Sequence, residues 1–126
     1  MSDSSHKNIK ILVVEDDVIS QITLVKMLNN MGFDEVDIVN DGDKALDKLA
    51  ETNYDIVIMD IFIKGDQNGI EVTRAIKSAY DIPVLYLSAS SDYHTFKQAM
   101  AGPNDGFLRK PYDYQKIFET IKKLVL

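Results

Sequence analysis

The chain of 126 residues has no cysteine. This absence excludes disulfide bonds, catalysis by a thiol and zinc sites built on cysteine, and it fits a reducing compartment. Long hydrophobic runs are also missing, because the longest apolar stretches have strand length and are bounded by charges. The amino terminus, MSDSSHKN, is polar where a secretory signal would be apolar. We therefore expect a cytoplasmic protein that is not inserted in a membrane.

Basic residues are outnumbered, with 14 lysines and arginines against 20 acidic residues and a net charge of −6. Such a balance disfavours a broad contact surface for the phosphate backbone, so we expect no direct binding of nucleic acid. An apolar content of 45% in 126 residues suffices for one compact domain with a core. We expect a flexible tail over residues 1–7 and a single domain over residues 8–126, with no output domain in this sequence.

Short runs rich in β-branched residues alternate with amphipathic stretches, a pattern typical of βαβ units and a mostly parallel sheet. Strands are expected at 9–14, 36–39, 56–59, 83–87 and 107–109. Helices are expected at 18 to about 31, around 45–50, at about 69–80, at about 92–100, and around 117–124 to the terminus. The strand at 56–59 is entirely apolar, which predicts burial on both faces.

The first helix is indicated by apolar residues at helical spacing, and its end by a glycine suited to the C-terminal cap. The spaced residues are Val18, Ile22, Val25 and Leu28, and the glycine is Gly32.

Charged residues follow three of the expected strands at the point where each strand ends. Glu15, Asp16 and Asp17 follow the first strand, Asp60 follows the third, and Lys110 follows the fifth. Ligands of parallel α/β sheets bind outside the carboxyl ends of the strands. These groups are therefore predicted to converge on one crevice.

Carboxylates held close together repel one another, and a cation relieves the repulsion. Magnesium, or manganese in its place, prefers oxygen ligands, so two or three carboxylates make a suitable site. Taken alone, Glu15, Asp16 and Asp17 are better explained as a helix cap and solvated loop acids. Asp60 at a second strand end favours the metal site, and Asp17 keeps the role of helix cap.

A carboxylate can also attack phosphorus to form an aspartyl phosphate, while a metal, a lysine and a hydroxyl bind the phosphoryl oxygens. Asp60 is the expected nucleophile, and Lys110 and Ser88 are the expected phosphate ligands. Lys110 as an ordinary surface lysine and Ser88 as a strand-end hydroxyl are the competing interpretations.

Four segments resemble the receiver domain of two-component response regulators, and the resemblance covers residues 8–126. They are, in chain order, 11–17 (ILVVEDD), 54–60 (YDIVIMD), 82–89 (IPVLYLSA) and 107–111 (FLRKP). The resemblance implies a flavodoxin-like, doubly wound sheet of five parallel strands in the order 2-1-3-4-5, with five helices.

The resemblance also implies individual roles. Asp16 and Asp60 would ligate the metal directly, Phe62 through its backbone carbonyl, and Glu15 directly or through water. Ser88 would act as the switch hydroxyl. Phe107 would be the aromatic that rotates on phosphorylation, although packing alone would also explain a strand phenylalanine.

The implied function is a signalling switch that receives a phosphoryl group from a sensor histidine kinase or a histidine phosphotransfer protein. Its fourth helix, fifth strand and fifth helix would then change their binding of a downstream protein that the sequence does not identify. The chain is expected to be a phosphoacceptor rather than an enzyme, although it would catalyse its own phosphorylation from small donors and slow dephosphorylation. A phosphorylation-dependent homodimer, and an origin in a longer hybrid kinase or multidomain regulator, stay open.

Three other functions compete with this one. A flavin or nucleotide carrier of the same fold would need an anion-binding loop after the first strand, where Glu15, Asp16 and Asp17 repel anions. An aspartate-nucleophile phosphatase would need a general acid, and Phe62 is not one. An interaction module that is not phosphorylated is the third.

The loop 61–69 departs from the usual receiver-domain pattern. It is one residue longer than the loop most common in that family, and it carries Lys64 where proline is usual. The metal contact through the backbone carbonyl of Phe62 is therefore a weaker expectation than the contacts of the acidic side chains.

Overall fold

Five β-α units make up the fold. The computed structural model describes residues 8–61, 68–88, 93–102, 105–109 and 113–125, and of Ser88 and residues 93–96 it describes the backbone alone. The elements are, in order, β1 (Lys10–Val14), α1 (Val18–Asn30), β2 (Glu35–Val39), α2 (Gly42–Glu51), β3 (Ile56–Met59), α3 (Gly69–Ala79), β4 (Val84–Ser88), α4 (Tyr93–Ala101), β5 (Phe107–Arg109) and α5 (Tyr114–Val125). All five strands lie within one residue of the ranges expected from the sequence.

The strands form one parallel sheet in the order β2-β1-β3-β4-β5, which confirms the predicted doubly wound topology. All four residues of β3 are buried, as its apolar sequence predicted. The register pairs Val14 of β1 with Met59 of β3, so these two strands end side by side. The residues that follow them, Glu15 and Asp60, therefore leave the sheet at the same edge.

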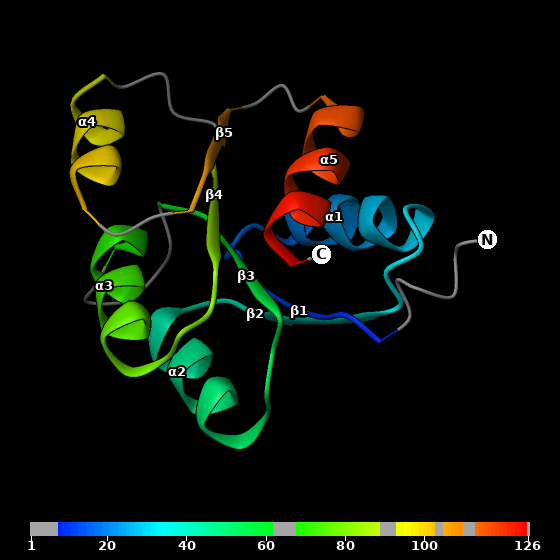
Figure 1. The fold of residues 1–126 in the computed structure, drawn as a ribbon, viewed down its shortest axis with the longest axis horizontal. Helices are drawn as coiled ribbons and strands as arrows, with labels where there is room; N and C mark the ends of the chain where they lie inside the picture. The colour runs from blue at the N-terminus through cyan, green and yellow to red at the C-terminus, as the bar shows by residue number, and fades with distance from the viewer. Residues whose placement is uncertain (1–7, 62–67, 89–92, 103–104, 110–112, 126) are drawn as a thin grey trace.

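Helices cover both faces of the sheet. In Figure 1, α1 and α5 lie on one side of the sheet, and α2, α3 and α4 lie on the other. Each layer has its own apolar cluster, which includes Leu24, Leu28, Ile117 and Ile121 on the first side and Ala45, Ile70, Ile76 and Ala99 on the second. Within the described residues, no helix combines the length and the apolar character that a membrane span requires.

α1 begins and ends next to the capping residues that the sequence predicted. The side chain of Asp17 accepts a hydrogen bond of 2.9 Å from the backbone N–H of Ser20, so it caps the helix as predicted. Gly32, just beyond the helix, has a φ of 99°, a conformation that favours glycine.

The face that α1 buries differs from the simplest interpretation of its apolar spacing. Leu24 and Leu28 are buried, whereas Val18, Ile19 and Ile22 are 63%, 75% and 63% exposed. At 3.6 residues per turn, Ile22 lies on nearly the opposite side of the helix from Leu24. The helix therefore carries two apolar faces, and only one of them packs on the sheet.

Candidate functional site

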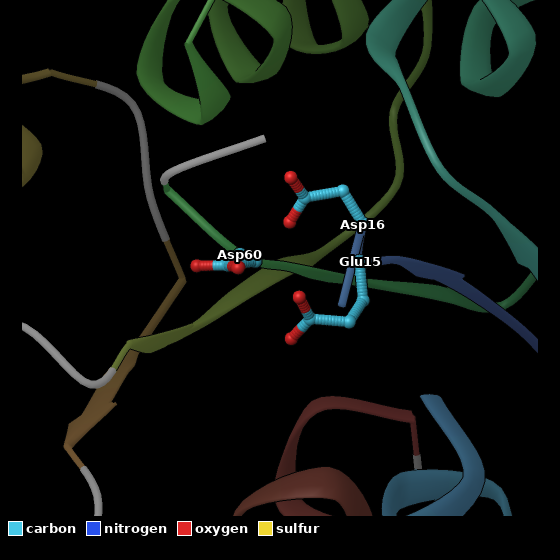
Figure 2. A group of neighbouring side chains, drawn as sticks. All are labelled: Glu15, Asp16 and Asp60. Atoms are coloured by element: carbon cyan, nitrogen blue, oxygen red, sulfur yellow. The ribbon is translucent and has the colours of Figure 1, made fainter. Parts of the chain in front are cut away.

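Three acidic side chains gather beyond the carboxyl ends of β1 and β3. Each of Glu15, Asp16 and Asp60 places a carboxylate oxygen so that the three oxygens lie within 4.8 Å of one another. Figure 2 shows the carboxylates turned to the same side of the two strand ends. The structure thus brings together the three carboxylates that the strand ends suggested, while Asp17 caps α1.

The loop between β1 and α1 is tied to its surroundings at Glu15, a residue that is only 3% exposed. Its backbone N–H donates to the carbonyl oxygen of Val39 at 3.0 Å. Its carboxylate Oε2 accepts from the backbone N–H of Asp17 at 3.1 Å. Its own carbonyl oxygen accepts from the side-chain amide of Gln21, Nε2 to oxygen, at 2.6 Å. The acidic loop is therefore held by β2, by α1 and by itself.

The backbone of Asp60 is tied to the neighbouring strand. Its N–H donates to the carbonyl oxygen of Val14 at 3.0 Å, which joins the ends of β3 and β1. The backbone N–H of Gly69, the first residue of α3, donates to the carbonyl oxygen of Ile61 at 2.7 Å. A Cβ on Gly69 would lie 2.3 Å from the carbonyl oxygen of Asp60, so the backbone of the two residues is in close contact.

The start of α3, which makes this contact, is fixed by a capping box. Asn68 accepts from the N–H of Glu71 at 3.0 Å through its side chain, and the Glu71 carboxylate accepts from the N–H of Asn68 at 3.1 Å. Such a reciprocal pair satisfies two backbone donors at a helix N-terminus. The capped start of α3 therefore lies against the backbone at the end of β3.

The electrostatics of the cluster favour a cation. Two unit charges 4.8 Å apart repel by about 3.5 kcal/mol at an effective dielectric constant of about 20, and the cluster contains three such pairs. Carboxylate oxygens are hard ligands, and a site of two or three of them suits Mg²⁺, which retains several waters of its own. The donor set of this cluster therefore fits a magnesium or manganese ion.

The remaining expected site residues are described in part or not at all. Ser88 ends β4, where its backbone is paired with that of Arg109 on β5, so the strand ends that carry Ser88 and precede Lys110 are neighbours. Lys110 and Phe62 lie outside the described residues. Their roles, and the role of the Ser88 hydroxyl, stay predictions.

Phe107 lies half-buried on β5, at the rim of the core on the α2, α3 and α4 side. Its ring centroid is 6.0 Å from that of Tyr86, and the guanidinium carbon of Arg109 is 5.9 Å from its centroid. Tyr86 is fully buried, and desolvation raises the pKa of its hydroxyl. Phe107 thus packs on the core from a position close to the surface, which is compatible both with a switch and with packing alone.

Gln21 was missed by the sequence analysis. A single glutamine in a helix forms no recognisable motif, and the partner of its amide is a backbone atom six residues earlier. The bond becomes visible only when the loop and the first turns of α1 are placed in space.

Comparison with known proteins agrees with this geometry. A family model described as the response regulator receiver domain matches residues 11–122. The osmosensing histidine protein kinase SLN1 of Saccharomyces cerevisiae is 31% identical over 122 residues, which cover 91% of this chain and 10% of that protein. The transcriptional regulatory protein ZraR of Escherichia coli K12 is 32% identical over 120 residues, or 94% of this chain and 27% of that protein.

A solved structure shows the same fold. It is the receiver domain of the sensor histidine kinase PA1611 from Pseudomonas aeruginosa PAO1, with a magnesium ion coordinated in its active-site cleft. It is 24% identical, has a TM-score of 0.83, and covers 92% of this chain and 96% of that one. The chain spans only about a tenth and a quarter of the two curated relatives above. From the family match over residues 11–122, this chain belongs to the receiver domain family of response regulators.

Proposed function

We propose that this chain is a phosphorylation-dependent switch of a two-component phosphorelay, with Asp60 as the phosphoacceptor. The observation that carries the proposal is the cluster of Glu15, Asp16 and Asp60, whose carboxylate oxygens lie within 4.8 Å of one another at the end of a receiver-domain sheet. Receiver domains are signalling domains rather than enzymes in the usual sense. We place the domain at residues 8–126 and the protein in the cytoplasm.

In the proposed reaction, a carboxylate oxygen of Asp60 attacks the phosphorus of a phosphohistidine. The new oxygen–phosphorus bond forms as the phosphorus–nitrogen bond breaks, and the imidazole leaves with its electron pair. A magnesium ion, when bound, would neutralise charge on the phosphoryl oxygens. Glu15, Asp16 and Asp60, with the backbone carbonyl of Phe62, would hold that ion, while Lys110 and Ser88 would bind the phosphoryl group.

The donor is proposed to be a sensor histidine kinase or a histidine phosphotransfer protein. Such a donor has to lie over the edge of the sheet where β1 ends, because its phosphohistidine must reach Asp60. α1 begins at this edge, and its exposed Val18, Ile19 and Ile22 give the surface an apolar character that suits a protein partner. With this donor we propose a downstream protein, not identified by the sequence, that would read the phosphorylated state, and a phosphorylation-dependent homodimer as a further form of the chain.

Intact mass measurement after incubation with acetyl phosphate tests this function. The wild-type chain is expected to gain one phosphoryl group only when magnesium is present, and Asp60→Asn to gain none. Asp55→Asn, at the opposite end of β3, is the matched control and should be phosphorylated like wild type. Absence of any adduct in wild type, with fast turnover excluded by measuring phosphate release, would instead favour an interaction module that is not phosphorylated.

The role of Phe107 is tested by Phe107→Ala. Because Phe107 lies at the rim of the core and is not one of the proposed metal or phosphate ligands, the rate of phosphorylation by acetyl phosphate should stay within about twofold of wild type. If Phe107 is the switch aromatic, the change in partner affinity on phosphorylation should be lost, as measured by titration calorimetry with the identified partner. An unchanged phosphorylation-dependent affinity would assign Phe107 to packing alone.

A further inference from the structure

The side chain of Gln21 contacts the backbone between two of the clustered acidic residues. Its Nε2 donates a hydrogen bond of 2.6 Å to the carbonyl oxygen of Glu15. That carbonyl belongs to the peptide unit that joins Glu15 to Asp16. A peptide unit is planar, so its orientation sets ψ of Glu15 and φ of Asp16 together. The bond from Gln21 therefore influences the direction in which both acidic side chains leave the loop.

Figure 2 shows why this direction matters. The side chains of Glu15 and Asp16 leave adjacent residues in different directions, and both curve toward the side on which the carboxylate of Asp60 lies. A change in the orientation of the peptide between them changes the path of the loop that carries both carboxylates. The separation of at most 4.8 Å among the three oxygens thus depends on how firmly this peptide is held.

The position of Gln21 on α1 restricts the movement of its side chain. Gln21 lies three residues before Leu24 and seven before Leu28, so all three share the face of the helix that packs on the sheet. Leu24 and Leu28 are buried in the core, and Gln21 is half-buried at the end of the same stripe. The amide is therefore anchored through the helix to the core, one turn from the acidic loop.

We propose that Gln21 is a positioning residue for the metal site, acting through the carbonyl of Glu15 to hold Glu15 and Asp16 in the geometry that binds a divalent cation. This inference rests on the proposed function. Groups that orient metal ligands typically change metal affinity by about 10- to 100-fold when removed. Because Gln21 acts through the backbone rather than on a ligand atom, we expect an effect of about tenfold, at the low end of that range.

The test compares Gln21→Met with wild type in the full chain. Methionine keeps the length and the unbranched shape of glutamine but removes the amide donor. The dissociation constant for Mg²⁺, measured by titration calorimetry, should rise about tenfold. The magnesium concentration at half-maximal phosphorylation by acetyl phosphate should rise by the same factor. The maximal rate at saturating magnesium should stay within about twofold of wild type. A general loss of folding would lower this maximal rate as well, so weaker magnesium binding with an unchanged maximal rate points to the metal site.

Gln115→Met is the matched control, because the Gln115 amide donates to the carboxylate of Glu119 at 3.0 Å on the exposed face of α5. Its magnesium affinity should equal that of wild type. Gln21→Leu is the second variant: it also removes the amide donor and should weaken magnesium binding as Gln21→Met does. In the metal-free protein, amide ¹⁵N–¹H spectra should show shifts at Asp16 and Asp17 in both Gln21 variants while β3 is unchanged.

Two outcomes would overturn the proposal about Gln21 while leaving the proposed function intact. One is a magnesium dissociation constant within twofold of wild type in both Gln21 variants. The other is an equal weakening in Gln115→Met. Wild-type protein that binds no magnesium would overturn the proposed function, and the role of Gln21 with it.

Discussion

Asp16→Ala is expected to abolish phosphorylation by acetyl phosphate while leaving the metal-free protein at least as stable as wild type. The mutation removes one of three clustered carboxylates, and with it two of the three repulsive pairs, each of which costs about 3.5 kcal/mol at an effective dielectric constant of about 20. Solvation of the side chains offsets part of this energy, so the gain in free energy of unfolding should be smaller than the sum. We therefore predict only the direction: in the absence of metal, the free energy of unfolding of Asp16→Ala is equal to or higher than that of wild type.

Wild type and Asp16→Ala should also differ in how much magnesium stabilises them. A ligand that binds only the folded state stabilises it by about 2.7 kcal/mol at a concentration of one hundred times its dissociation constant. Wild type should therefore gain about this amount when magnesium replaces EDTA at that concentration, and Asp16→Ala should gain almost nothing. Urea unfolding of both proteins under the two conditions measures the difference. Asp34→Ala, an exposed residue between α1 and β2, is the control and should respond to magnesium as wild type does.

A clear loss of stability of Asp16→Ala in EDTA would refute the repulsion argument, because the carboxylate would then be making a favourable contact in the metal-free fold. Retention of the magnesium response in Asp16→Ala would show that Glu15 and Asp60 suffice as ligands.

The sequence was informative about the site because parallel strands end at the same edge of a sheet. Three acids after β1 and one after β3 had to lie near each other once the strands paired, and the register of Val14 with Met59 produces that outcome. The cap formed by Asp17 was equally accessible, because a helix N-terminus uses side chains within a few residues of itself. Local rules and the topology of the sheet were sufficient in both cases.

Other features depend on tertiary packing, which the spacing of residue types along the sequence does not predict. α1 is apolar on two faces, and only its placement on the sheet decides that Leu24 rather than Ile22 is buried. The bond between Gln21 and the Glu15 carbonyl requires the exact path of a short loop. Gly69 was expected only as the start of a helix, yet its contact with the Asp60 backbone follows from how α3 approaches the end of β3. These are tertiary properties, and no pattern of residue types along the chain encodes them.

Gly69→Ala is the second substitution with a large expected effect, and two physical terms predict opposite signs for it. Alanine is favoured over glycine inside a helix by up to about 1 kcal/mol, which would stabilise α3. A Cβ at position 69, however, would lie 2.3 Å from the carbonyl oxygen of Asp60 and 2.7 Å from the Cα of Ile61. Both atoms belong to the backbone, so no side chain can rotate to make room. Overpacking of this kind typically costs about 1–3 kcal/mol, and the steric term should prevail.

The displacement would also reach the reacting carboxylate. The backbone N–H of Asp60 is hydrogen-bonded to Val14 and its carbonyl oxygen lies against Gly69, so a shift of this carbonyl moves the side chain of Asp60 relative to Glu15 and Asp16. A misplacement of about 1 Å can cost a reaction about 100-fold, and we expect phosphorylation by acetyl phosphate to slow by about that factor.

The control for this substitution is Gly102→Ala, beyond the end of α4, where the nearest atom to an added Cβ is the flexible Arg74 Nε at 3.4 Å. Its free energy of unfolding should change by less than about 0.5 kcal/mol. The measurements are urea unfolding in EDTA and the initial rate of phosphoryl incorporation at saturating magnesium, for both variants and wild type. If Gly69→Ala were as stable as wild type and phosphorylated at the same rate, the end of β3 would have to be able to move away from α3 without moving the carboxylate of Asp60. A slow rate with unchanged stability would instead separate the two effects and show that the close contact serves the position of Asp60 more than the stability of the fold.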